Sequence, residues 1–232
     1  MSLLDMIGPI MIGPSSSHTA GACRLALLAR HTLQRPAERA KLTLHGSFAK
    51  TAKGHGTELA LTAGILGYYP HDPRIPQALS IAKKQQLDIV FDAADLGDVH
   101  PNTVCIELEN RTEKSHLTGS SLGGGSIQVF EIDAFEVRFS GRYHTLLLRH
   151  VDQTGVIAHV AQVIADNEGN IATLYSARQK KGGEAMMSIE IDKRLSQYVL
   201  DYLTHLPYIR WLRILPEVIS GEGHLSGTGD VA

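Results

Sequence analysis

The feature that most constrains the fold is the order of six segments in the second half of the chain, after Gly141. Their hydrophobic periodicity alternates between that of strands and that of amphipathic helices. The two helical segments each carry apolar side chains on one face: Val156, Val160, Val163 and Ile164 in the first, and Leu195, Val199 and Leu203 in the second. The expected elements are a strand, a helix, two strands, a helix and a strand, at Tyr143–His150, Val156–Glu168, Asn170–Gln179, Glu184–Ile191, Arg194–Leu206 and Tyr208–Leu215.

This βαββαβ order is the ferredoxin-like arrangement, which we expect over residues 143–216. Residues 1–140 mix strand patterns with two helices, so the expected class of the whole chain is α+β. The strand candidates in this first part are Leu42–Phe48, Leu87–Phe91, Thr103–Glu109, Ser126–Ile132 and Phe135–Phe139. With 232 residues the chain exceeds the common domain size of about 100–150 residues, which favours two domains.

Two glycine-rich segments are expected to lie outside helices and strands. Gly119–Gly125 lacks the Gly-Lys-Ser/Thr ending of a phosphate-binding loop, so a turn between strands is the favoured interpretation. Residues 217–232, with four glycines between Gly221 and Gly229, are expected to form a flexible tail.

Composition excludes several classes of function. A formal net charge of −2 lacks the general basic footprint of nucleic-acid-binding proteins. The apolar runs are far shorter than the roughly 20 residues that span a bilayer, and no basic segment followed by an apolar one opens the chain. We therefore expect a cytoplasmic protein with neither a membrane nor a nucleic-acid partner. Cys23 and Cys105 are the only cysteines, too few for the four thiolates that hold an iron–sulfur cluster, and we assign no metal ligand to this chain.

Polar side chains crowd one turn near the N-terminus, in Gly13-Pro14-Ser15-Ser16-Ser17-His18-Thr19. An expected helix follows this turn, and the free N–H groups at a helix start attract anions, to which hydroxyls can add hydrogen bonds. The candidate binding residues for an amino-acid carboxylate or a similar anion are Ser15, Ser16, Ser17 and Thr19. The alternative is a helix cap, which explains one hydroxyl but not five polar side chains together.

Two further histidines lie in unusual loops. His55 lies between two glycines at the start of an expected helix, beside Lys53. Glycines permit close approach of a substrate, and a cationic neighbour together with a helix N-terminus favours a neutral imidazole that can accept a proton. His100 precedes Pro101-Asn102-Thr103, where proline restricts the direction of the preceding residue. From local sequence alone, an Asx-type turn that enters the following strand is the favoured interpretation of His100.

These motifs, taken in order, resemble those of the bacterial iron–sulfur-dependent L-serine dehydratases. The same resemblance includes Gly46-Ser47-Phe48-Ala49, Gly54-His55-Gly56-Thr57 and Gly123-Gly124-Gly125, and it covers about residues 1–140. In that family this region is an allosteric-substrate-binding-like mixed α/β domain. The second half resembles an ACT domain, an amino-acid-sensing module with the βαββαβ order. Together the two halves resemble the β chain of the two-subunit type.

The resemblance implies a subunit that completes the active site of an α subunit, which would hold a 4Fe-4S cluster and convert L-serine to pyruvate and ammonia. Iron would accept the hydroxyl of serine while a base removes the α-proton. It further implies that His55 is the base and that His18 and His100 are supporting catalytic residues. The implied substrate-binding residues are Ser15, Ser16, Ser17, Thr19, Asn102 and Thr103.

Resemblance to an ACT domain implies an amino-acid effector and side-by-side dimers. The implied effector-binding residues are Asp152, Gly155 and Asn170, although capping the helix that follows is the favoured single role for Asp152. The competing function is a noncatalytic sensor, in which the first domain binds a carboxylate and the second an amino acid.

Overall fold

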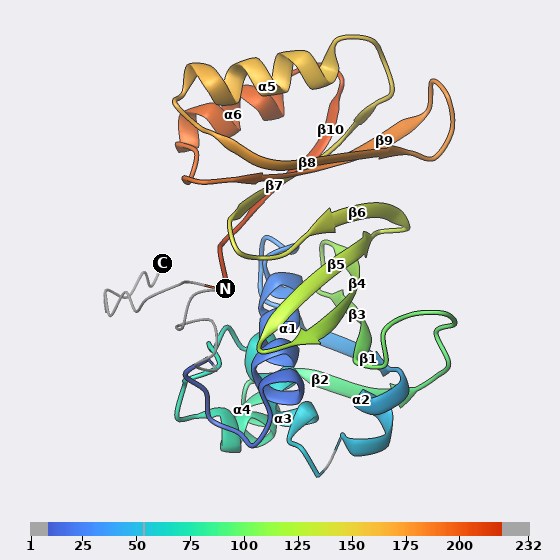
Figure 1. Cartoon of the computed structure of the whole chain (residues 1–232), viewed down its shortest axis with the longest axis vertical. Coiled ribbons are helices and arrows are strands. Elements are labelled where there is room, and N and C mark those ends of the chain that lie inside the picture. The colour runs from blue at the N-terminus through green and yellow to red at the C-terminus, as the bar shows by residue number, and fades with distance from the viewer. Residues whose placement is uncertain (1–8, 53, 220–232) are drawn as a thin grey trace.

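The computed structural model describes residues 9–52 and 54–219, which form two β-sheets with helices packed against each (Figure 1). The first sheet has the strand order β2-β1-β3-β4-β5-β6 and the second has the order β10-β7-β9-β8. The expected α+β class is thereby confirmed. Within the described residues, no helix is long and apolar enough to cross a membrane.

All strands of the first sheet are antiparallel to their neighbours except β1 and β2, which run parallel. Its strands are β1 (Arg39–Leu44), β2 (Asp88–Ala93), β3 (Thr103–Glu109), β4 (Lys114–Gly123), β5 (Ser126–Ile132) and β6 (Phe135–Phe139). Its helices are η2, a π-helix (Ser16–Gly21), α1 (Ala22–Arg30), α2 (Gly46–Thr51), α3 (Thr57–Ile65), a 3-10 helix η3 (Ile75–Gln77) and α4 (Ala78–Lys84). Alternating side chains of β3 are fully buried against α1, as the sequence pattern predicts.

Helices α1 and α3 pack closely, and this contact brings the two polar loops together. A Cβ atom at Gly64 of α3 would lie 2.3 Å from the carbonyl oxygen of Cys23 in α1, so only glycine permits this approach. Helix α1 continues directly from η2, which means that the expected serine loop is itself helical from Ser16 onward. Only Ser15 keeps the extended backbone of a helix cap, and its hydroxyl accepts the N–H of His18.

The expected strand Leu42–Phe48 is wrong beyond Leu44. The chain turns at Gly46, whose φ of +53° favours glycine, and enters the short helix α2. The N–H of Ser47 donates to the carbonyl of Pro101 at 2.7 Å, so this segment pairs with a loop rather than with a strand. Hydrophobic residues such as Phe48 then enter the core from a helix.

The expected turn at Gly119–Gly125 is shorter than predicted. Gly119 lies within β4, where a Cβ atom would be 2.6 Å from the side chain of Leu25, so glycine lets helix α1 approach the sheet. Gly123 pairs with Ser126, which leaves Gly124 and Gly125 as the hairpin loop. Both have positive φ values, 59° and 79°, as a two-residue hairpin turn of type I′ requires.

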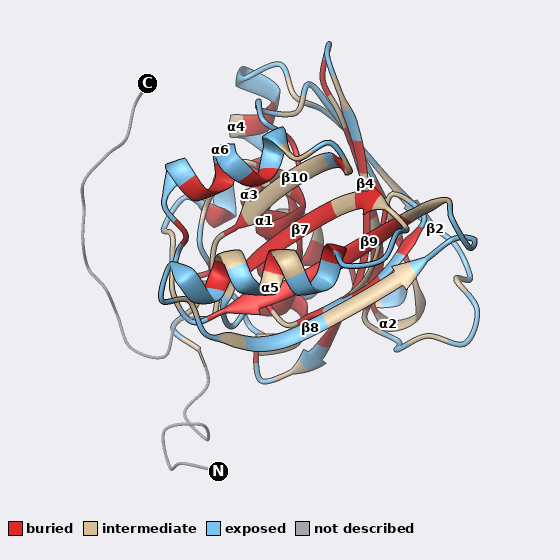
Figure 2. Ribbon diagram, turned by 90° about the horizontal axis from the view of Figure 1, so that it is seen from above, coloured by how far each residue is buried: buried red, intermediate tan, exposed pale blue. Residues whose placement is uncertain are grey.

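All six elements expected in the second half are present, with ends shifted by at most three residues. They are β7 (His144–Val151), α5 (Val156–Asp166), β8 (Ile171–Arg178), β9 (Glu184–Ile191), α6 (Gln197–His205) and β10 (Ile209–Leu215). Helices α5 and α6 bury their apolar faces against one face of the sheet. Figure 2 shows β7 and β9 as mostly buried, whereas the edge strand β8 is exposed along much of its length.

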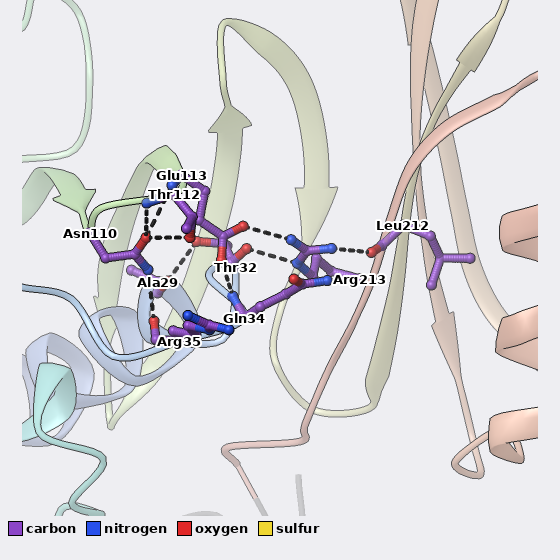
Figure 3. Close-up of polar contacts among 9 residues, drawn as sticks. All are labelled: Ala29, Thr32, Gln34, Arg35, Asn110, Thr112, Glu113, Leu212 and Arg213. Carbon is purple, nitrogen blue, oxygen red and sulfur yellow. Dashed lines mark hydrogen bonds and ion pairs between the residues drawn. The ribbon is translucent and has the colours of Figure 1, made fainter.

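The opposite face of the second sheet packs against the N-terminal part. Three of its side chains belong to the N-terminal core: Leu147, Met186 and Leu215. Arg213 of β10 donates to Glu113 at 2.8 Å and to the carbonyl of Thr32 at 3.0 Å (Figure 3). Glu190 of β9 is 3% exposed and accepts hydrogen bonds from the connecting residue Ser140, whose Oγ lies at 2.7 Å. Apolar and polar contacts therefore both join the two sheets.

The segment after β10 returns to the connection between the sheets. Val218 is 3% exposed, and its N–H donates to the carbonyl of Gly141 at 2.9 Å. The expected flexible tail, residues 217–232, thus begins with ordered contacts, and residues 220–232 lie outside the described residues.

Candidate functional site

His18 in η2 is the centre of the candidate site and is only 8% exposed. The hydroxyl of Ser15 lies 3.3 Å from Nδ1 of its imidazole and also accepts the backbone N–H of His18 at 3.2 Å. The hydroxyl of Ser47, at the start of α2, lies 3.2 Å from Nε2. The imidazole is therefore held at both nitrogens, and the edge of its ring packs against Phe48.

His55 faces His18 from the turn that precedes α3. The two ring centroids are 5.0 Å apart with an interplanar angle of 65°. Burial, and then the proximity of His55, lower the pKa of His18, while a hydrogen bond with Ser47 opposes this shift. His18 is therefore a neutral imidazole near pH 7, whereas the exposed His55 is open to a ligand. Lys53, which was expected to act on His55, lies outside the described residues.

The His100 loop is ordered by its own hydrogen bonds. Nδ1 of His100 accepts the N–H of Asn102 at 3.1 Å, and the hydroxyl of Thr103 donates to the carbonyl of His100 at 2.6 Å. Thr103 is fully buried and also bonds Ser120, so it shapes the loop and does not face a ligand. His100 itself is exposed. Among the described residues, neither a hydrogen bond nor a ring contact joins it to the other two histidines.

Several buried polar atoms next to this site have no hydrogen-bond partner within the described part of the chain. The described residues contain eight such atoms in all. Four of them belong to elements of the site: Thr19 Oγ1, Thr57 Oγ1, Asn102 Oδ1 and Ser121 Oγ. These elements touch, because η2 contacts both α3 and β4, and the N–H of Ser121 donates to the carbonyl of Asn102. Buried polar groups are normally satisfied, so their concentration indicates a place where a ligand, water or another chain supplies partners.

The structure thus brings together some of the predicted site residues. Ser15, His18, Thr19 and His55 lie on contacting elements, and Ser16 and Ser17 are partly buried in the same π-helix. Sequence reasoning missed Ser47 and Ser121. The signal for Ser47 was its place in the Gly46–Ala49 motif, but the segment was predicted to be a strand. Ser121 was hidden in a stretch interpreted as a turn.

Two surface hollows lie away from these histidines. One, of about 350 Å³, lies between α4 and β2, and the other, of about 400 Å³, lies over charged residues of the first sheet such as Lys41, Glu107 and His116. Neither includes a residue of the His18 site. Neither hollow contains two histidines in ring contact, so we place the candidate site at His18 and His55.

The predicted effector residues do not converge within one chain. Asp152 does not cap α5, whose cap is Gly155 with a φ of +89°. Instead its carboxylate accepts the N–H of Gly182 at 2.9 Å and a hydrogen bond from Arg178, and the Gly182 bond is the main reason that its pKa is lowered. Asn170 lies beyond the other end of α5, a helix of 11 residues and about 16 Å in length.

The thiols of this chain do not fit an iron–sulfur cluster. Within the described residues, no group of three or more His, Cys, Asp or Glu side chains is arranged to hold a metal ion. Burial raises the pKa of Cys23 to about 12, and burial is also the main reason that the pKa of Cys105 rises to about 11. Without a metal both thiols are protonated at neutral pH, and two cysteines are fewer than the four thiolates that hold a cluster.

Comparison with known proteins explains the two-part architecture. Residues 2–84 match the family model for the serine dehydratase beta chain, and residues 146–210 match an AHAS small subunit-like ACT domain. The chain is 44% identical to a probable L-serine dehydratase beta chain of Bacillus subtilis, over 90% of this chain and 94% of that protein. The chain belongs to the serine dehydratase beta chain family. It is also 41% identical to the L-serine dehydratase beta chain of Peptoniphilus asaccharolyticus, over 84% of this chain and 89% of that one.

More distant similarity reaches beyond serine dehydratases. A D-3-phosphoglycerate dehydrogenase of Bacillus subtilis is 24% identical over 84% of this chain but only 37% of its own length. The arrangement of two domains seen in this family is therefore also similar to part of a protein named for another reaction.

Proposed function

We propose that this chain is the β subunit of an L-serine dehydratase that yields pyruvate and ammonia, and that it completes the active site of a partner α subunit. The observation that supports this most directly is the pairing of His18 with His55 beside four unpartnered polar atoms, in a chain that is 44% identical to a protein named as such a beta chain. A 4Fe-4S cluster would be held by the partner, because the two cysteines of this chain are too few for the four thiolates that hold one.

Elimination requires removal of the weakly acidic α-proton of serine, and this chain would supply the base. The exposed His55 is suited to accept that proton on a ring nitrogen. His18, neutral and held at both nitrogens by Ser15 and Ser47, would position the substrate, and the hydroxyls of Ser16 and Ser17 would bind its carboxylate or ammonium group. The exposed His100 would border the pocket. Departure of the hydroxyl group would be assisted by the partner subunit.

Anaerobic reconstitution tests the assignment. The purified chain and a candidate α subunit are assayed separately and together for pyruvate release from L-serine. Only the pair should be active. Pyruvate release by the isolated chain, accompanied by cluster absorbance, would contradict the proposal.

Two histidine variants separate the proposed roles. In the reconstituted pair, His55→Ala should lower kcat by about 10²–10⁴-fold, the usual effect of losing a general base. His18→Ala should mainly raise KM, since it would remove binding shared by substrate and transition state. His205→Ala, at an exposed end of α6, serves as the control and should change neither constant. Near-normal turnover of His55→Ala per folded complex would overturn its assignment as the base.

We also propose that the ACT-like domain binds an amino-acid effector and pairs with a second copy. Asp152 and Gly155 lie together at the start of α5, and Asn170 could approach them only from another chain. Calorimetric titration of the full chain with individual amino acids, followed by the same titration of Asp152→Asn, tests this. Absence of binding to the wild-type chain across the common amino acids would remove the effector assignment.

The noncatalytic sensor is the second candidate function. It is favoured by the similarity of 84% of this chain to part of a D-3-phosphoglycerate dehydrogenase. Amino-acid binding by a chain that no α subunit renders active would support the sensor over the dehydratase subunit.

A further inference from the structure

The hydrogen bonds around His18 indicate which of its two ring nitrogens carries the proton. The backbone N–H of His18 donates to the hydroxyl oxygen of Ser15, which also lies 3.3 Å from Nδ1. An oxygen that accepts one hydrogen bond becomes a better donor, so Ser15 most favourably donates its proton to Nδ1. Nδ1 is then the acceptor nitrogen of the neutral ring, and Nε2 carries the proton.

The other tautomer, with the proton on Nδ1, is less favourable. If Nδ1 carried the proton, the oxygen of Ser15 would accept two hydrogen bonds, and no described residue accepts its own proton. With the proton on Nε2, Ser15 and the imidazole each accept and donate, and only the hydroxyl proton of Ser47, at the end of the chain, lacks an acceptor among the described residues. The Nε2 proton then points to the hydroxyl oxygen of Ser47, 3.2 Å away.

Ser47 is held firmly enough to act as this acceptor. It occupies the second position of α2, and its backbone N–H donates to the carbonyl of Pro101 at 2.7 Å. A Cβ atom at Gly46 would lie 2.7 Å from the same carbonyl, so the start of α2 and the His100 loop are in close contact. Once Ser47 accepts from His18, its own hydroxyl proton has no acceptor among the described residues and is available to an oxygen of a bound ligand.

We propose that Ser47 is a positioning residue, which holds His18 as the Nε2-protonated tautomer and ends the hydrogen-bond chain with a hydroxyl donor directed toward substrate. The tautomer is a property of the isolated chain, whereas the effect on turnover rests on the proposed dehydratase function. The two parts can therefore fail separately.

Nitrogen NMR of the histidine-labelled full chain tests the tautomer without any partner. At pH 8 the His18 nitrogens of the wild type should show protonation at Nε2, assigned with the His18→Ala spectrum. Ser47→Ala should shift the Nε2 resonance, and Ser47→Thr, which retains a hydroxyl, should restore it. A wild-type His18 protonated at Nδ1, or an Nε2 resonance unchanged in Ser47→Ala, would overturn the proposal.

Kinetics of the reconstituted pair test the positioning role. Ser47→Ala should raise KM by about three- to tenfold, as expected for one lost hydrogen bond, with a smaller change in kcat. In the His18→Ala background the hydroxyl of Ser47 is no longer oriented by the imidazole, so the same substitution should raise KM by a smaller factor than it does in the wild type. Ser80→Ala, which removes a helical serine from exposed α4, should leave both constants unchanged.

A purely structural role would give a different pattern. Ser47→Ala would then lower the amount of folded complex, measured by circular dichroism, without the dependence on His18. Ser47→Cys supplies a second variant of similar volume and poorer acceptor strength, and it should raise KM in the same direction. An additive double variant, or a wild-type KM for both Ser47 variants, would refute the positioning role. Inactivity of the wild-type pair with a confirmed Nε2 tautomer would instead remove the dehydratase function alone.

Discussion

Among the single residues, His18 and His31 share a lowered pKa, and burial is the first cause for both. Their second causes differ, since His18 faces His55 whereas His31 lies beside the Arg30 guanidinium. His31 closes the C-terminal end of α1, where the helix dipole would favour a cation. The effects of burial and Arg30 on the pKa of His31 are larger than the effect of the helix dipole, so His31 is neutral near pH 7. Protonation of His31 therefore destabilises the fold.

The lowered pKa of His31 predicts that the free energy of unfolding depends on pH. Burial and then Arg30 lower the pKa of His31 from its ordinary value of about 6.5 to about 4, so between these values the unfolded chain binds a proton that the folded chain does not. The free energy of unfolding should therefore fall by up to about 3 kcal/mol as the pH drops from 7 to 4. Urea denaturation of His31→Gln across this range should show a shallower loss than the wild type, whereas exposed His205→Gln should match it. Parallel curves for His31→Gln and wild type would contradict the assignment.

Sequence alone identified the loops that carry His18 and His55 but not their contact. The two residues are 37 positions apart, and the approach of their rings depends on the packing of α1 against α3. No local pattern encodes that distance. The role of Thr103 was likewise beyond sequence reasoning, because a hydroxyl in a polar loop looks available until its burial is known.

At the scale of elements, the accuracy of prediction followed the clarity of side-chain alternation. Strand β3 was predicted with its observed ends, since Val104, Ile106 and Leu108 alternate with polar residues. Strand β4 was missed, because its glycines and serines carry little hydrophobic signal although much of the strand is buried. Its glycine at position 119 is needed for helix packing rather than for a turn. Gly119 was therefore wrongly predicted to lie in a turn, because glycine is required there for close packing and not for backbone freedom.

The α1–α3 contact predicts contrasting effects for two glycine substitutions. Gly64→Ala would place a methyl group 2.3 Å from the carbonyl of Cys23, so the helices must separate. Overpacking of this kind typically costs about 1–3 kcal/mol, which exceeds the gain of about 1 kcal/mol in helix propensity. Gly54→Ala meets nothing closer than 3.9 Å and should change the free energy of unfolding by less than about 0.5 kcal/mol. Thermal and urea unfolding of both variants measure this, and a stabilised Gly64→Ala would show that the helices separate without cost.

On the scale of the whole molecule, the ACT-like sheet adds side chains of one face to the N-terminal core, although its other face forms a separate core with α5 and α6. Leu147, Met186 and Leu215 belong to the ACT-like sheet but pack in the N-terminal core. The buried carboxylate of Glu190 accepts hydrogen bonds from the connecting residue Ser140, and Glu113 pairs with Arg213 across the same boundary. Chains with two domains often unfold in separate steps, but a shared core favours one cooperative transition. Any effector bound by the second sheet would then act on a surface continuous with the His18 domain.

This shared core predicts coincident unfolding by two probes. Trp211, the single tryptophan, packs against the N-terminal core from β10, so its fluorescence reports the boundary, while far-UV circular dichroism reports both sheets. The two urea transitions should coincide. Glu113→Gln leaves the largely buried guanidinium of Arg213 without its charged partner, so both transitions should shift together by about 1–3 kcal/mol. Glu38→Gln removes an exposed ion pair with Arg111 and should shift them by less than about 0.5 kcal/mol. Fluorescence that changes before circular dichroism would show instead that the boundary opens while the two sheets remain folded.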